Sequence, residues 1–143
     1  MKGLILFACL GFCIWLGLNY LPLPSPPDVN INSIEQDVFN SINTERKNHN
    51  LHELQWDLIL HDMAQEHSKW MVATNNLTHS NYGICENCWR GIGYKPDELA
   101  SICFVTWRDS PRHYENMLDP SINHCAIGFA QSDNETYATF LAK

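Results

Sequence analysis

The sequence contains no cluster of lysine or arginine. Its 9 basic residues are spread along the chain and are outnumbered by 16 acidic ones, for a net charge of −7. A nucleic-acid-binding protein needs a concentrated basic surface to neutralise phosphates, so this composition argues against a nucleic-acid partner. The same absence argues against electrostatic attachment to an anionic membrane surface. The chain also lacks internal repeats, and the roughly 115 residues that follow its N-terminal segment are enough for one domain with a single core.

The N-terminal segment lacks charge over residues 3–21. A helix of this length is sufficient to span the hydrocarbon core of a bilayer, which is roughly 30 Å thick. No Ala-x-Ala cleavage motif precedes Pro22, which favours a retained single-pass anchor over residues 1–21. A cleaved signal peptide stays open as the alternative. Both interpretations place the rest of the chain outside the cytosol, because Lys2 stays on the inner side.

A proline-rich stretch, Pro-Leu-Pro-Ser-Pro-Pro at residues 22–27, follows directly. Proline favours the extended polyproline II conformation, so we expect residues 22–30 to form a stiff linker. The globular domain should then occupy residues 31–143.

Within this domain, helical patterns come first and strand patterns follow. Ser33 and Gln36 fit a capping box, and Pro111 after Ser110 fits the first turn of another helix. The order of elements predicts an α+β fold, with helices packed on a small antiparallel sheet and an apolar helix before the domain. We expect helices at about 33–47, 58–73, 97–108 and 110–118, an extended segment near residue 86, and a hairpin of strands 125–130 and 136–142.

Four blocks of sequence occur in an order and at spacings typical of one family. They resemble the CAP superfamily, which comprises the cysteine-rich secretory, antigen 5 and pathogenesis-related 1 proteins (SCP domain), and in particular its short prokaryotic-type members. The resemblance covers about residues 34–140. The blocks are Leu54-Gln-Trp-Asp57 with Ala64-Gln-Glu-His-Ser68, Leu77-Thr-His-Ser80, Cys85-Glu-Asn87, and Trp107-Arg-Asp-Ser-Pro-Arg-His-Tyr-Glu-Asn-Met-Leu118 followed by Ile127-Gly-Phe-Ala130.

The resemblance implies a three-layer α-β-α sandwich with an open cleft. In the family, two histidines and two acidic residues line this cleft, where a divalent metal, often zinc, is bound. His79 and His113 match the two histidines, and Glu86 matches one acid. Ser110 stands where the second acid is usual, so the resemblance implies an incomplete metal site made of His79, Glu86 and His113.

Three functions are compatible with these residues. The first is an extracytoplasmic binding module that holds a lipid, a cell-wall glycan component or a peptide in the cleft lined by His79, Glu86, Ser110 and His113. The second is a hydrolase of peptidase type, with metal-activated water and Glu86 as general base, or with Ser110 or Ser80 activated by His113. The third is a domain tethered to the membrane by its N-terminal helix, without a ligand. We favour binding without catalysis and without a required cofactor.

Four cysteines lie in the domain, and an even number outside the cytosol is typical of two disulfides. Cys85 with Cys88 and Cys103 with Cys125 are the favoured pairs. Crossed pairs, such as Cys85 with Cys125 or Cys88 with Cys103, stay open. A Cys85–Cys88 bond requires a sharp turn, because residues three apart on an extended strand are roughly 10 Å apart.

Overall fold

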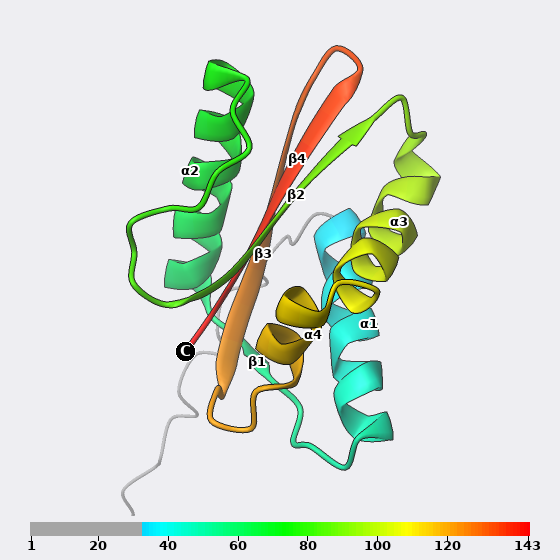
Figure 1. Cartoon of the computed structure of the whole chain (residues 1–143), viewed down its shortest axis with the longest axis vertical. Coiled ribbons are helices and arrows are strands. Elements are labelled where there is room, and N and C mark those ends of the chain that lie inside the picture. Colours follow the sequence, from blue (N-terminus) through cyan, green and yellow to red (C-terminus); the bar gives the residue numbers. More distant parts are fainter. Residues whose placement is uncertain (1–32) are drawn as a thin grey trace, which may run out of the picture. The chain divides into compact units, whose positions relative to one another are not determined.

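A four-stranded sheet lies between two layers of helices in the computed structural model (Figure 1). The structure describes residues 33–143, so the predicted membrane segment 1–21 and linker 22–30 lie outside the described residues. Between residues 33 and 143, no helix has both the length and the apolar character needed to cross a bilayer. The elements are α1 (Ser33–Asn48), β1 (Gln55–Trp56), α2 (Leu58–Thr74), β2 (Cys85–Ile92), α3 (Pro96–Arg108), α4 (Pro111–Leu118), β3 (His124–Ser132) and β4 (Glu135–Ala142).

The layers follow the α-β-α arrangement that the sequence predicts. Helix α2 packs against β3 and β4 on one face, while α1 packs on β3 and both α3 and α4 pack on β2 from the other face (Figure 1). The predicted hairpin is confirmed as the antiparallel pair β3–β4, and β2 adds to β4, also antiparallel. The sheet is not purely antiparallel, however, because the two-residue strand β1 pairs with β3 in parallel. The strand order is β1-β3-β4-β2.

Short-range signals set the ends of α2. The side chain of Asp57 accepts hydrogen bonds from the backbone N–H groups of Ile59 and Leu60, at 2.8 and 3.0 Å. These two groups have no partner within the helix, so the aspartate caps them. The helix stops at Asn75, which adopts a left-handed conformation with φ of 48°. The loop that begins there carries His79 to the start of β2.

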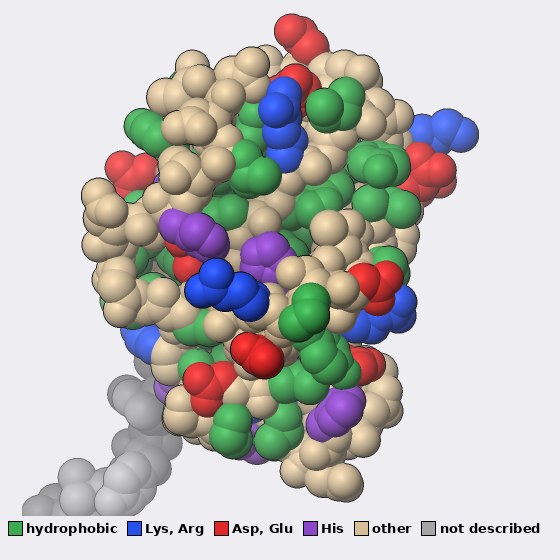
Figure 2. Space-filling model, viewed as in Figure 1, with side chains coloured by type: hydrophobic (Ala, Val, Ile, Leu, Met, Phe, Trp, Pro, Cys, Tyr) green, Lys and Arg blue, Asp and Glu red, His purple; other side chains and the backbone are tan. Residues whose placement is uncertain are grey.

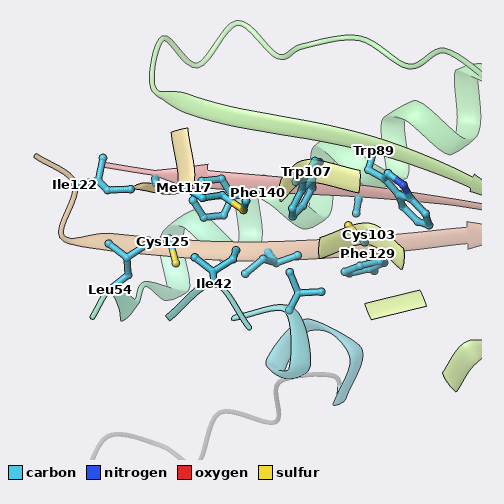
Figure 3. Packing of buried hydrophobic residues seen from close by; sticks show 14 of the residues in the cluster. Ile42, Leu54, Trp89, Cys103, Trp107, Met117, Ile122, Cys125, Phe129 and Phe140 are labelled. Atoms are coloured by element: carbon cyan, nitrogen blue, oxygen red, sulfur yellow. The ribbon is translucent and has the colours of Figure 1, made fainter. Parts of the chain in front are cut away.

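The main core lies between the sheet and the layer formed by α1, α3 and α4 (Figure 3). Trp107 is completely buried in it, and its indole N–H donates to the carbonyl of Cys88 at 3.3 Å. This bond fixes α3 to β2, so the start of α4 is held above the same strand. Other fully buried members of the cluster are Val38, Ile42, Cys103, Met117, Cys125, Ile127, Ala138, Phe140 and Ala142.

The predicted disulfides are absent: all four described cysteines are free thiols. Cys85 and Cys88 both lie in β2, where residues three apart point to opposite faces of the sheet, so the favoured pair cannot close. Cys103 and Cys125 share the main core but lie at different positions along the sheet (Figure 3).

The crossed pairs do not fit either. Cys85 and Cys125 both lie opposite Ala142 of β4, from β2 and β3 respectively. Two strand spacings, about 10 Å, therefore separate them, beyond the reach of a disulfide at about 7 Å. Cys88 packs with Met71 and Tyr137 on the α2 side of the sheet, whereas Cys103 lies on the other side.

Candidate functional site

The predicted site residues line one open cleft of about 650 Å³. His79 comes from the loop before β2, Glu86 is the second residue of β2, and His113 lies in the first turn of α4. Ser110, which precedes α4, also lines the cleft. Figure 2 shows histidine, basic and acidic side chains next to one another on the face that it displays. The remaining lining residues are Ser80, Gly83, Ile84, Cys85, Arg112, Glu115 and Asn116.

His79 and Glu86 form a hydrogen-bonded pair at the entrance to this cleft. Nδ1 of His79 lies 2.7 Å from Oε2 of Glu86, and the backbone N–H of Ser80 also donates to Oε2, at 2.9 Å. The carboxylate is buried, whereas 63% of the His79 side chain is exposed. Because a carboxylate only accepts, Nδ1 of His79 carries the proton. In the neutral ring, the lone pair on Nε2 is therefore available to a ligand.

His113 differs from His79 in the environment of its Nδ1 atom. Its Nδ1 is buried and has no hydrogen-bond partner. An N–H group buried without an acceptor is costly, so we infer that the proton of the neutral ring is on Nε2. Burial lowers the pKa of His113 below its ordinary value, and the nearby His79 and Arg112 lower it further. The ring is thus neutral at physiological pH and offers a donor.

Two asparagines hold α4 against β2 and so fix the cleft. The side-chain amide of Asn116 donates to the carbonyl oxygen of Glu86 at 3.1 Å and to Oδ1 of Asn87 at 2.8 Å. Asn87 in turn donates to the carbonyl of His113 at 2.9 Å. Both asparagines stand in the blocks that resemble the CAP family, and their positioning role follows from these contacts. The network explains how residues from two elements meet in one site.

The predicted metal set of His79, Glu86 and His113 fits a zinc ion only in part. A metal-binding histidine nearly always donates its second N–H to an acceptor, and His79 meets this condition through Glu86. His113 does not, because its Nδ1 is buried without an acceptor. The carboxylate of Glu86 already accepts hydrogen bonds from His79 and Ser80. Ser110 stands where the second acidic ligand would be expected from the resemblance. We therefore derive no metal-dependent step at this cleft.

The predicted serine nucleophiles are also not activated. Over residues 33–143, no hydrogen bond joins the hydroxyl of Ser80 or Ser110 to His113. The hydroxyl of Ser80 instead accepts from the backbone N–H of Tyr82 at 3.3 Å. A nucleophilic serine needs a base within hydrogen-bonding distance, and neither Ser80 nor Ser110 has His113 in that position.

Comparison with known proteins places this arrangement in context. A protein of Bacillus subtilis (strain 168), YkwD, is 26% identical over 129 residues, which covers 79% of this chain and 49% of YkwD. The chain thus spans about half the length of this curated relative.

Several solved structures have a similar fold, and two of them illustrate the similarity. One is an extracellular protein from Bacillus anthracis str. Ames that contains an SCP domain. It has a TM-score of 0.56 and 24% identity over 84% of this chain and 45% of that one. The other, NaASP2 solved with Zn²⁺, has a TM-score of 0.67 and 14% identity over 82% of this chain and 83% of that one.

A family model described as the cysteine-rich secretory protein family (CAP) matches residues 39–142, nearly the whole described domain. The match begins within α1 and includes α2, α3 and α4, all of β2, β3 and β4, and every residue of the cleft. The chain therefore belongs to the cysteine-rich secretory protein (CAP) family.

Proposed function

We propose that this CAP domain acts outside the cytosol as a non-enzymatic binding module. Its ligand is a peptide, or the peptide part of a cell-wall component, held between His79 and His113. The similar extracellular protein of Bacillus anthracis and the uncharged segment 3–21 support this location. Anchoring through residues 1–21 is part of the same proposal.

The observation that carries the proposal is the different environment of Nδ1 in the two histidines of one cleft, since Nδ1 of His79 meets a carboxylate and Nδ1 of His113 has no partner. The hydrogen bond to Glu86 leaves Nε2 of His79 as an acceptor, and the orphaned Nδ1 of His113 leaves its Nε2–H as a donor. A peptide group has one N–H and one C=O, so it can use both. The guanidinium of Arg112 in the same cleft suits a carboxylate.

The lining of the cleft disfavours the lipid alternative. Sites for acyl chains are lined predominantly by apolar side chains. Here, among the described residues, Ile84 and Cys85 are the only apolar side chains of the lining, and the others are mostly polar or charged. Catalysis is disfavoured because the carboxylate of Glu86 is engaged by His79 and Ser80 and is not free to act as a base.

Titration calorimetry with the full-length chain tests this proposal. We expect short peptides with a free carboxyl end to bind, and amidated peptides and fatty acids to bind more weakly or not at all. His79→Ala and His113→Ala should each weaken binding about tenfold, the effect of losing one hydrogen bond of roughly 1.4 kcal/mol. His124→Ala is the matched control, because His124 does not line the cleft.

Mass spectrometry of the peptide after incubation separates binding from hydrolysis. An intact peptide agrees with the binding module. Cleavage that is lost in Glu86→Gln would instead establish the hydrolase, and binding that is equal in all variants would place the ligand elsewhere.

A further inference from the structure

A second group of metal-ligating side chains lies on the α2 side of the sheet. His67 comes from α2, whereas Glu86 and Cys88 come from β2. One ligand atom from each of the three lies within 4.8 Å of the other two, and Nε2 of His67 is 3.9 Å from Oε1 of Glu86. All three residues are between 6% and 9% exposed. The predicted cleft residue His113 is not among them.

Two protons in this group point at one backbone oxygen. The ring N–H of His67 donates to the carbonyl of Thr78 at 2.9 Å, and the thiol of Cys88 donates to the same carbonyl at 3.4 Å. The carboxylate of Glu86 lies beside them and uses its Oε2 for His79. The carbonyl of Thr78, a carboxylate, a thiol and an imidazole thus lie close together, and protons occupy positions that a cation can take.

We infer that His67, Glu86 and Cys88 bind a divalent cation of the zinc class, with the carbonyl of Thr78 as a fourth ligand. The charges balance, because a thiolate and a carboxylate together neutralise a doubly charged ion. On binding, the Cys88 thiol releases its proton to solvent. His67 loses the proton from Nε2 and gains one at Nδ1, so the ring stays neutral. One proton is released in total.

The ligand types determine which ion the site takes. Thiolate and imidazole select zinc or cobalt over magnesium and calcium, which prefer oxygen. Burial raises the pKa of Cys88 to about 12, and Glu86 contributes, so the thiol stays protonated until a cation displaces the proton. With four ligands from the protein and none from water, the site is of the structural type. The ion would join α2, the loop at Thr78 and β2.

This site is distinct from the cleft of the proposed function, although Glu86 contributes to both. Its Oε1 lies 3.9 Å from Nε2 of His67 and accepts from the backbone N–H of Ser80 at 3.2 Å, and its Oε2 accepts from His79. The cation therefore leaves the hydrogen bond to His79 in place. It also fixes the loop that carries this histidine.

Cobalt(II) titration of the reduced full-length chain tests the inference, with absorption spectroscopy as the readout. A thiolate bound to cobalt gives a charge-transfer band in the near ultraviolet, and tetrahedral geometry gives intense visible bands. We expect both, and we expect zinc to abolish them by displacement while magnesium and calcium do not. Zinc should also raise the Tm of the wild-type chain.

Variants locate the site. Cys88→Ser should remove the charge-transfer band, and His67→Gln should weaken binding at least tenfold. Cys103→Ser, a buried cysteine on the other face, and His113→Gln, in the cleft, should bind cobalt as the wild type does. Circular dichroism checks that each variant is folded.

Two results would overturn the inference. One is the absence of a charge-transfer band in the wild-type chain at millimolar cobalt, a result that does not depend on any variant folding. The other is a band that persists in folded Cys88→Ser. If His113→Gln lost cobalt binding while Cys88→Ser bound cobalt as the wild type does, the ion would instead lie in the cleft.

Discussion

Replacing Gly128 by alanine is expected to lower the free energy of unfolding by about 3 kcal/mol, at the upper end of the usual cost of overpacking. A Cβ at this position of β3 would lie 2.4 Å from the backbone nitrogen of Gln65 and 2.5 Å from the carbonyl carbon of Ala64. Both atoms belong to the backbone of α2, so no side chain can rotate away. The hydroxyl of Ser68 also donates to the carbonyl of Gly128 at 2.9 Å, and a displaced helix would lose this bond.

Urea unfolding followed by circular dichroism measures this change. Ser132→Ala, an exposed position of the same strand, is the control and should change stability by no more than about 0.5 kcal/mol. A Gly128→Ala variant as stable as the wild type would show that α2 does not contact β3 this closely.

The second large effect is expected for Arg46→Met, with a loss of about 4 kcal/mol. Arg46 is completely buried. Its Nη1 donates to the carbonyls of Met117 and Asp119 at 2.8 and 2.9 Å, and its Nε donates to the carbonyl of His52 at 2.9 Å. Methionine has a similar length but no donor, so three carbonyls at the end of α4 and in the loop after α1 would lose a charged partner.

The neighbouring residue supplies the control for this variant. Lys47 is exposed and forms a surface ion pair with Glu53 at 2.7 Å, so Lys47→Met should cost at most about 1 kcal/mol. Equal stability of the two variants in thermal and urea unfolding would contradict the structural role of Arg46.

Local signals in the sequence were enough to predict most of the fold. The Pro111 helix start and the short apolar runs of β3 and β4 each act over a few residues, and the helices and hairpin are found where these signals indicate. The strand β1 was missed, because its two residues are a strand only through pairing with β3, about 70 positions away.

The cysteines show how an expectation about the cellular compartment can mislead. An even number of cysteines favoured disulfides, but β2 is extended from Cys85 through Cys88 and turns the two side chains to opposite faces. The strand geometry, which the sequence also indicated near Glu86, was the better guide.

The family resemblance predicted which residues line the cleft. The chemistry of these residues could be determined only from their contacts in the structure. The resemblance named His79, Glu86 and His113, which the structure brings to one cleft. That Glu86 orients His79 depends on a hydrogen bond across a loop. That His67 and Cys88 share the carbonyl of Thr78 depends on the packing of Cys88 against Met71 of α2, which no periodicity reveals.

The most direct test of the shared cleft is an NMR titration of the full-length chain labelled with ¹⁵N at histidine. We expect Nδ1–H for His79, Nε2–H for His113, and a His113 pKa below its ordinary value, because burial and the charge of His79 oppose protonation of His113. In His79→Ala the pKa of His113 should rise, and in His124→Ala it should not change. A His113 pKa that is the same with and without His79 would contradict the convergence of the two rings.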